Sequence, residues 1–256
     1  MLFVRLSVAR VALRANEKKM GKAKSVFLEF VRVVVNGDID DVARRLKANP
    51  SLATASTDVG ATRQGAADFF FTDIAHYLYA GDTALHMAAA AFRRPVAELL
   101  IARGADCRAR NHRGAEPLHY AADANRWEPT AQVQTIEYLV SVGADPNALD
   151  RSGVAPLHRA VRTRSLPAVR ALLDGGANSR AKNKAGSTPL HLAVQNTGRG
   201  GSGSEHAREQ QAGIIKLLLE RGARPSDKDS KGKPVRQAAT SEWIRALLAR
   251  PKRKTD

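Results

Sequence analysis

The sequence predicts an all-α fold, an α-solenoid of stacked helix-turn-helix repeats with β-hairpin fingers. The first observation is a tetrapeptide that recurs along the 256-residue chain in near copies, which begin at Thr83, Glu116, Ala155, Thr188 and, in a divergent form, Lys233. The second is the spacing of the copies. Their third residues lie at positions 85, 118, 157, 190 and 235, so the first and third steps are equal and the second and fourth are longer. A unit of about 33 residues with insertions is typical of a stacked repeat protein and not of one compact globule.

Each repeat contains residues that start, pack and end a pair of helices. Thr188 before Pro189 suits a helix N-cap followed by a first turn in which the missing proline N–H is not needed. Leu157 and Ala160 lie three residues apart and therefore share one face of the first helix. The second helix ends at a glycine such as Gly176, which suits a left-handed residue after a helix. One such unit cannot bury its apolar faces alone, so the repeats are predicted to stack.

A second motif, Gly-Ala-Asp or a close variant, follows each helix pair at residues 104–106, 143–145, 176–178 and 222–224. Together with the tetrapeptide and the period, it makes the chain resemble the ankyrin repeat family. The resemblance is strong over residues 82–226 and weaker over the terminal caps at 24–50 and 233–249. It implies a non-catalytic protein–protein interaction module, an adaptor or regulatory subunit, whose partner binds the concave face formed by finger tips and first helices. It does not identify the partner.

The spacing divides the chain into three parts. Residues 1–23 are a basic segment, interpreted as disordered or as a misassigned start with Met20 as the alternative first residue. Residues 24–249 are the repeat domain, and residues 250–256 are a basic tail. The domain has a cap (24–50), an aromatic insertion (51–81), repeats 2 to 5 (82–113, 114–152, 153–185 and 186–231) and a C-terminal cap (232–249). Extra residues lengthen repeat 3 around 125–132 and repeat 5 within 197–210.

The caps are predicted to be helix pairs, over 25–35 and 38–48 at one end and over 234–239 and 241–250 at the other. The aromatic insertion is dense in aromatic residues for a chain that is 5% aromatic. Phe70, Ile74, Tyr77 and Leu78 have helical spacing, which favours a helix packed back on the stack. The alternative is an aromatic contact surface, since aromatic residues anchor many interfaces. Its candidate residues are Phe69, Phe70, Tyr77 and Tyr79.

The formal net charge of +16 is concentrated at the ends of the chain. Residues 1–24 carry +6 and residues 245–256 carry +4, which leaves +6 for the repeats. We therefore expect the repeats to bind a protein, and polyanion or nucleic-acid binding through the basic ends and fingers stays as the alternative. The tail reads as a solvated disordered segment or as a nuclear-import patch.

The composition also bears on location. No apolar run reaches the roughly 18 residues of a membrane span. The single cysteine, Cys107, excludes an internal disulfide and fits a reducing compartment. We predict a cytoplasmic monomer, with a nuclear or membrane-surface location left open.

No catalytic, cofactor or metal site is predicted. His86, His119, His158 and His191 recur in register, but each lies one repeat from the next, about 10 Å away, whereas zinc ligands converge within about 2.1 Å of one ion. The family resemblance implies instead that these histidines tie adjacent loops together. A Gly-rich pattern at 198–203 matches a dinucleotide fingerprint, but it lies in an insertion and not between a strand and a helix. We interpret it as a flexible loop.

The candidate partner-binding residues come from the finger tips and from the first helices, at positions carried over from the family. Basic side chains recur in three of the four fingers, which suggests a partner with an acidic segment; the alternative is that these are ordinary solvated finger tips. The predicted partner-binding residues are Arg108, Arg110, His112, Arg113, Tyr120, Leu149, Arg151, Arg159, Arg162, Arg180, Lys182 and Lys184.

Overall fold

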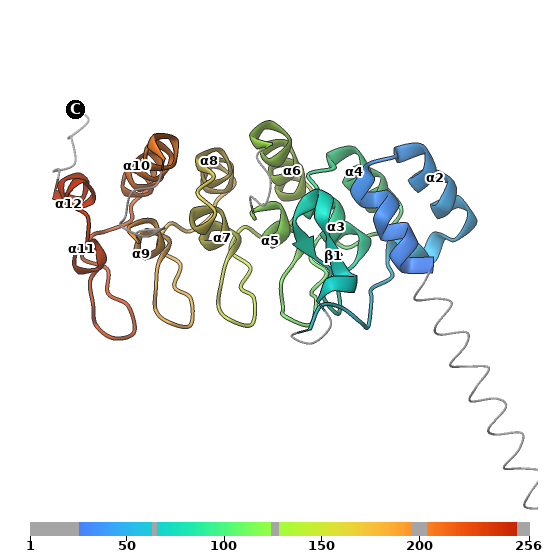
Figure 1. The fold of residues 1–256 in the computed structure, drawn as a ribbon, viewed down its shortest axis with the longest axis horizontal. Coiled ribbons are helices and arrows are strands. Elements are labelled where there is room, and N and C mark those ends of the chain that lie inside the picture. Colours follow the sequence, from blue (N-terminus) through green and yellow to red (C-terminus); the bar gives the residue numbers. More distant parts are fainter. Residues whose placement is uncertain (1–25, 63–65, 124–127, 196–203, 250–256) are drawn as a thin grey trace, which may run out of the picture.

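The computed structural model describes residues 26–62, 66–123, 128–195 and 204–249, and the basic segments 1–23 and 250–256 lie outside these ranges. The repeats stand side by side in one elongated row, with helices along one side and finger loops along the other (Figure 1). Within the described ranges, no helix has both the length and the apolar character that a membrane crossing requires.

Each repeat contributes an inner helix beside its finger and an outer helix behind it (Figure 1). The inner helices are α3 (Ala84–Ala90), α5 (Pro117–Ala121), α7 (Pro156–Arg162), α9 (Pro189–Ala193) and α11 (Val235–Ala238). The outer helices are α4 (Arg94–Ala102), α6 (Pro129–Ser141), α8 (Leu166–Asp174), α10 (Glu205–Glu220) and α12 (Glu242–Ala249). The N-terminal cap has a helix whose described part covers residues 26–36, followed by α2 (Ile39–Ala48). Asp38 begins α2 by accepting a hydrogen bond from the Asp41 N–H at 2.9 Å.

One continuous apolar core runs through the row, from Phe27 in the cap to Ile244 in α12. The leucines of the recurring tetrapeptide lie at its centre, and Leu85, Leu118 and Leu190 expose no surface. All seven residues of α3 are buried, and four of them are alanines. Because these side chains are small, neighbouring inner helices can approach closely, and each repeat completes the core of the next.

The four recurring histidines link each repeat to the finger that follows it. Each Nδ1 atom accepts the N–H of the residue that caps its own helix. Each Nε2–H donates to a carbonyl of the next finger. The Nε2 acceptors are the carbonyls of Ala115 for His86 (3.1 Å), Val154 for His119 (3.0 Å), Ser187 for His158 (3.1 Å) and Lys233 for His191 (3.3 Å). Because both ring nitrogens are used inside the stack, these imidazoles serve the fold and not a metal.

A ladder of backbone hydrogen bonds joins successive finger tips, one bond per repeat. Its donor–acceptor pairs are His112 to Ala80, Arg151 to Arg113, Lys184 to Ser152 and Ser230 to Ala185, at 2.9, 2.9, 3.1 and 3.1 Å. Each tip is a tight turn; in one of them Asp150 Oδ1 accepts the N–H groups of Ser152 and Val154. Gly153 in that turn has a φ of +72°, and a Cβ atom there would lie 2.8 Å from the Lys184 nitrogen. Each repeat finger is a short hairpin turn closed by one backbone hydrogen bond, such as that from the Asp150 N–H to the Val154 carbonyl at 3.0 Å. Among the described residues, isolated strand bridges join Ser56 to Thr83 and Lys228 to Pro234.

The fingers and the helices differ in how they accommodate extra length. From the glycine that ends an outer helix to the next N-cap the chain always takes the same length, over 104–116, 143–155, 176–188 and 222–234. The helix pair of each repeat extends from the N-cap of its inner helix to the glycine after its outer helix. These intervals are 83–104, 116–143, 155–176 and 188–222, and the second and fourth are longer than the other two. Extra length therefore lies within the helix pairs, in the connection and in the outer helix, with one exception. The segment from the α2 C-cap at Asn49 to Thr83 is much longer than a finger and occupies the place of one.

The aromatic insertion fills this exceptional finger, and the prediction of a helix there was wrong. It contains the 3₁₀ turns η1 (Pro50–Ala53), η2 (Ala67–Phe69) and η3 (Thr72–Ile74), and the antiparallel strands β1 (Phe70–Phe71) and β2 (His76–Tyr77). Ala75 has a φ of +47°, which reverses the chain between the strands and cannot occur inside a right-handed helix. The helical spacing arose because Ile74 in the turn and Leu78 beyond it both anchor the hairpin in the core.

The two other insertions lengthen outer helices. α6 starts at Pro129 and has 13 residues, against 9 in α4 and α8. α10 has 16 residues and includes 205–210, which were assigned to the insertion in repeat 5. Most of the Gly- and Ser-rich run at 197–204, and residues 124–127, lie outside the described part of the chain.

Candidate functional site

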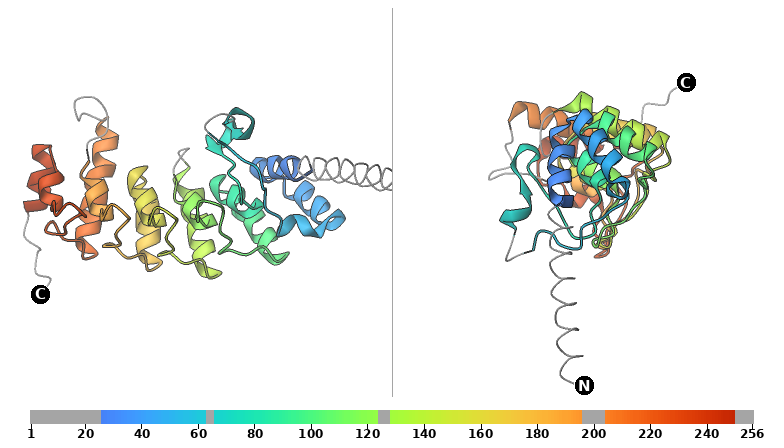
Figure 2. Two further views of the ribbon diagram at one scale, coloured as in Figure 1. Left: turned by 90° about the horizontal axis from the view of Figure 1, so that it is seen from below. Right: turned by 90° about the vertical axis from the view of Figure 1, so that its right-hand side faces the viewer.

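A cleft of about 610 Å³ opens in the angle between the inner helices and the fingers of repeats 2 to 4. One of its walls comes from the end of the aromatic insertion, which Figure 2 shows standing out from the row of helices. We call it the concave cleft. It is lined by His76, Tyr79, Asn111, His112, Arg113, Ala115, Tyr120, Asp123, Asp150, Arg151, Ser152, Val154, Arg159 and Arg162. Seven of the sixteen predicted contact residues are among them.

A buried polar network forms the floor of the concave cleft. The Tyr120 hydroxyl donates to the fully buried Asp82 carboxylate, 2.8 and 2.9 Å from its two oxygens. Asn111 Nδ2 donates to Asp82 Oδ1 at 2.8 Å and to the Tyr120 oxygen at 3.0 Å, and the Tyr79 N–H donates to Asp82 Oδ2 at 2.6 Å. Burial, and then the Asp82 charge, raises the pKa of Tyr120 well above its usual value, so the phenol stays protonated.

Tyr120 was predicted as an exposed contact residue, and that prediction was wrong. The side chain is 1% exposed because its ring fills the space between two histidine rings. The ring centroids of His76 and His86 lie 4.5 and 5.1 Å from that of Tyr120. Tyr120 therefore fixes the aromatic insertion to the inner helices of repeats 2 and 3 and contributes almost no exposed surface to the cleft.

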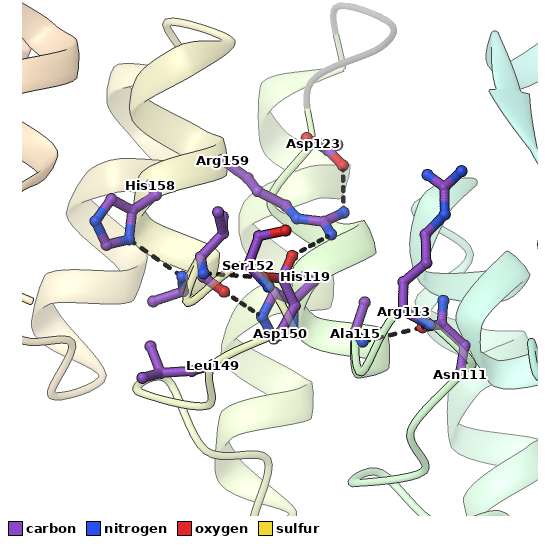
Figure 3. Close-up of polar contacts among 12 residues, drawn as sticks. Asn111, Arg113, Ala115, His119, Asp123, Leu149, Asp150, Ser152, His158 and Arg159 are labelled. Carbon is purple, nitrogen blue, oxygen red and sulfur yellow. Dashed lines mark hydrogen bonds and ion pairs between the residues drawn. The ribbon is translucent and has the colours of Figure 1, made fainter. Parts of the chain in front are cut away.

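Arg159 was also predicted to be exposed, and it is held inside the cleft instead. Its guanidinium lies 2.9 Å from an Asp123 oxygen and 3.3 Å from an Asp150 oxygen, and its side chain is 14% exposed (Figure 3). Burial opposes the charge of Arg159, but the neighbouring carboxylates, Asp123 above all, outweigh burial and raise its pKa. Arg162 reaches the other Asp123 oxygen at 3.3 Å but stays 65% exposed. Arg159 is thus neutralised within the protein, whereas Arg162 remains accessible to a ligand.

Arg113 and Arg151 are the two arginines of the cleft for which the described part of the chain provides no ion-pair partner. In the ranges that the structure describes, no carboxylate lies within ion-pair distance of either one. The Arg113 guanidinium is stacked 3.6 Å from the centre of the Tyr79 ring. In Figure 3 its side chain extends to the same side of the finger as Arg159 and Asp123. Arg151 comes from the neighbouring finger, and its N–H donates to the Arg113 carbonyl at 2.9 Å.

Other predicted finger residues lie outside the concave cleft, and several hold the fingers together. Arg108 Nε donates to the Gly143 carbonyl at 2.9 Å. Arg110 donates to the carbonyl of Leu149 and lies 3.4 Å from Glu116 Oε1. Arg180 makes a two-pronged ion pair with Asp227, at 2.6 and 2.9 Å. Leu149, Lys182 and Lys184 are exposed on the fingers outside the cleft, and His112 is exposed within the cleft lining.

The sequence reasoning missed the acidic and amide groups of the site, Asp82, Asn111 and Asp123. Asn111 and Asp150 occupy the same place in successive fingers, where turn residues are expected, so their positions in the turns could have been predicted from the sequence. Asp82 and Asp123 carry no comparable signal, because their partners are 38 and 36 residues away along the chain. Among the described residues, no three His, Cys, Asp or Glu side chains gather as metal ligands would.

Inner and outer helices in a single row, fingers joined tip to tip and a hollow on the finger side define a helical repeat solenoid. The family model of ankyrin repeats (three copies) matches residues 31–150 and 128–229. The chain belongs to the ankyrin repeat family. Ankyrin repeats are in general protein–protein interaction modules and are typically non-catalytic. No curated protein matches this chain significantly.

Proposed function

We propose that this protein is a non-catalytic adaptor or regulatory subunit that captures an acidic segment of a partner protein on its concave face. The observation that carries the proposal is the unpaired state of Arg113 and Arg151 beside a neutralised Arg159. A guanidinium binds a carboxylate through two parallel hydrogen bonds, so arginines on two neighbouring fingers suit an acidic segment. Exposed Lys182 and Lys184 extend the positive charge to the next finger.

We further propose that the protein acts as a cytoplasmic monomer. The exposed large apolar side chains in the described residues are distributed over the molecule and do not form one broad patch. They are Val26, Ile39, Phe70, Val142 and Leu149.

A charge-reversal experiment tests the concave face. The variant replaces Arg113, Arg151, Lys182 and Lys184 with Glu. The ion-paired Arg110 and Arg180 are kept, because reversing them would also break contacts of the fold. The matched control replaces four exposed cations of the cap and the outer helices with Glu, giving the same change of net charge: Arg32, Arg103, Arg170 and Lys216.

The assay is affinity capture from lysate of the source cells at about 150 and about 400 mM salt. The electrostatic screening length is about 8 Å at the lower salt concentration and shorter at the higher one. We expect one discrete protein to be retained by wild type and by the control and to be lost by the cleft variant. Equal retention by both variants would exclude the concave face. Recovery of mixed nucleic acid by all three proteins, lost at the higher salt, would favour polyanion binding through the basic ends.

A further inference from the structure

A strip of aromatic rings connects an exposed phenylalanine of the hairpin with the arginines of the concave cleft. Phe70 and Tyr77 face each other across the two strands, with ring centroids 4.7 Å apart. The Tyr77 and Tyr79 centroids are 6.1 Å apart, and the Arg113 guanidinium lies 3.6 Å from the Tyr79 ring centre. We call Phe70, Tyr77 and Tyr79 the aromatic strip.

The fold holds this strip firmly in place. Ile74 and Leu78, on either side of β2, have no exposed surface. The Leu78 N–H donates to the Phe69 carbonyl at 2.9 Å, and Asp82 accepts the Tyr79 N–H in the floor network. Phe70 is nevertheless 38% exposed. An exposed phenylalanine on an anchored hairpin beside an unfilled basic cleft is a surface that an apolar side chain of a ligand would cover.

Stacking on Tyr79 also determines how Arg113 can bind a ligand. One face of its guanidinium is covered by the ring, so the N–H groups at its edge remain for an acceptor. Because the stack holds the planar group in one orientation, less conformational freedom is lost when a carboxylate binds. Arg151, joined to Arg113 through the finger backbone, supplies the second set of donors.

The arrangement of charge favours a protein segment over a nucleic acid. A nucleic-acid strand carries a phosphate at every nucleotide and needs a continuous positive track. Here the unpaired arginines lie at one end of the aromatic strip, and Asp73 lies in the hairpin turn at the other. Asp123 and Asp150 also line the cleft. The surface therefore suits one localised negative charge followed by an uncharged apolar group.

We propose that the partner's segment is an extended peptide with two determinants. A carboxylate side chain binds between Arg113 and Arg151, and a large apolar side chain packs on Phe70 and Tyr77. The three ring separations together set an upper limit of about 15 Å on the distance from the Phe70 ring to the Arg113 guanidinium. An extended peptide spans that distance in about four or five residues. The inference rests on the proposed function and assigns the aromatic insertion the role of a specificity determinant.

A peptide selection followed by double-mutant cycles tests the inference. Random peptides of about 12 residues, long enough to span the strip and the cleft, are displayed and selected on the full-length wild-type chain. We expect the selected peptides to share an acidic residue and a large apolar residue at a fixed separation of about five residues or fewer. A synthetic peptide from the selection, labelled with a fluorophore, is then titrated by fluorescence anisotropy.

The binding measurements use Phe70→Ser and the pair Arg113→Gln with Arg151→Gln. Their controls are Ile39→Ser, an equally exposed apolar residue on α2, and Arg103→Gln with Arg170→Gln on the outer side. Circular dichroism of each variant checks the fold. Phe70→Ser should weaken binding of the selected peptide about tenfold. When the apolar residue of the peptide has been replaced by Ser, the same protein variant should bind that peptide as weakly as wild type does. The double variant of Arg113 and Arg151 should likewise weaken binding of the selected peptide, and it should have no further effect on a peptide whose Asp or Glu has been replaced by Asn or Gln.

The outcomes separate the two proposals. Selected peptides that share only acidic residues, with affinity unchanged by Phe70→Ser, would overturn the inference and leave the proposed function standing. Selected peptides without acidic preference, or a failure to select any peptide above the background, would count against both. Equal losses in the cleft variants and in their controls would also overturn the inference, because the effect would then not depend on the cleft.

Discussion

The most direct test of the architecture described above is Tyr120→Phe, which removes one oxygen atom from the floor of the concave cleft. The change keeps the ring, and with it the contacts to His76 and His86. It deletes the hydroxyl that donates to the Asp82 carboxylate and accepts from Asn111. Because Asp82 exposes no surface, water cannot take the place of the lost donor.

Two contributions set the expected magnitude. A hydrogen bond to a charged acceptor contributes about 1.5–3 kcal/mol, and leaving a buried N–H of Asn111 without its acceptor costs about 1–3 kcal/mol. Since the two effects overlap, we expect the free energy of unfolding to fall by about 2–4 kcal/mol. For a chain of this size that corresponds to a loss of about 5–15 °C in Tm.

The assay is urea unfolding followed by far-ultraviolet circular dichroism, with Tyr138→Phe as the matched control. Tyr138 lies half-buried on α6, and its hydroxyl has no hydrogen-bond partner among the described residues, so the control should stay within about 0.5 kcal/mol of wild type. A loss below about 0.5 kcal/mol for Tyr120→Phe would refute the buried network. Equal losses for the two tyrosines would show that the ring environment, and not the hydroxyl, determines stability.

Three further predictions concern the histidine links, the arginines of the cleft and the finger turns. Burial lowers the pKa of His119 to about 4, so below about pH 6.5 this histidine binds more protons in the unfolded chain than in the folded one. The free energy of unfolding should therefore fall by about 3 kcal/mol for this group between pH 7 and pH 4. His119→Gln should flatten that part of the pH profile of urea unfolding. Arg159→Met should cost about 3–5 kcal/mol, because one oxygen of Asp123 and one of Asp150 lose their cation inside the protein. Arg162→Met should cost less than about 1 kcal/mol, and similar losses for the two variants in thermal unfolding would contradict the different burial of the two side chains. Gly176→Ala should cost about 1–2 kcal/mol from its left-handed backbone alone, and Gly153→Ala should cost more because its Cβ would meet the Lys184 nitrogen; the reverse order in chemical unfolding would argue against close packing of the fingers.

The repeats were readable from the sequence because their signals are local and recur. The order Thr188–Pro189, the leucine that follows and the glycine that ends each outer helix each act within a few residues, and the period repeats them. The four histidines were interpreted correctly as links between repeats, since both of their hydrogen bonds come from positions fixed by the repeat.

The site was less predictable because its contacts join positions that no period relates. Tyr120 and Arg159 occupy places on the inner helices that face the concave side, so sequence position alone suggested exposure. Asp82 and Asp123, the carboxylates that bind them, lie in other repeats at irregular positions. The hairpin was mistaken for a helix for a related reason. Ile74 and Leu78 are four residues apart and both buried, but long-range packing buries them, and not the turn of a helix.

The constant length of the fingers has an evolutionary consequence. Residues added between an inner and an outer helix leave the spacing from one finger to the next unchanged, so one rim of the molecule can grow by insertion while the register along the fingers is preserved. The aromatic insertion is a different kind of addition, because it replaces a finger and enters the face where that register lies. In the proposed binding mode, a lineage that gained or lost such a segment would change which partner segment binds without rebuilding any of the helices.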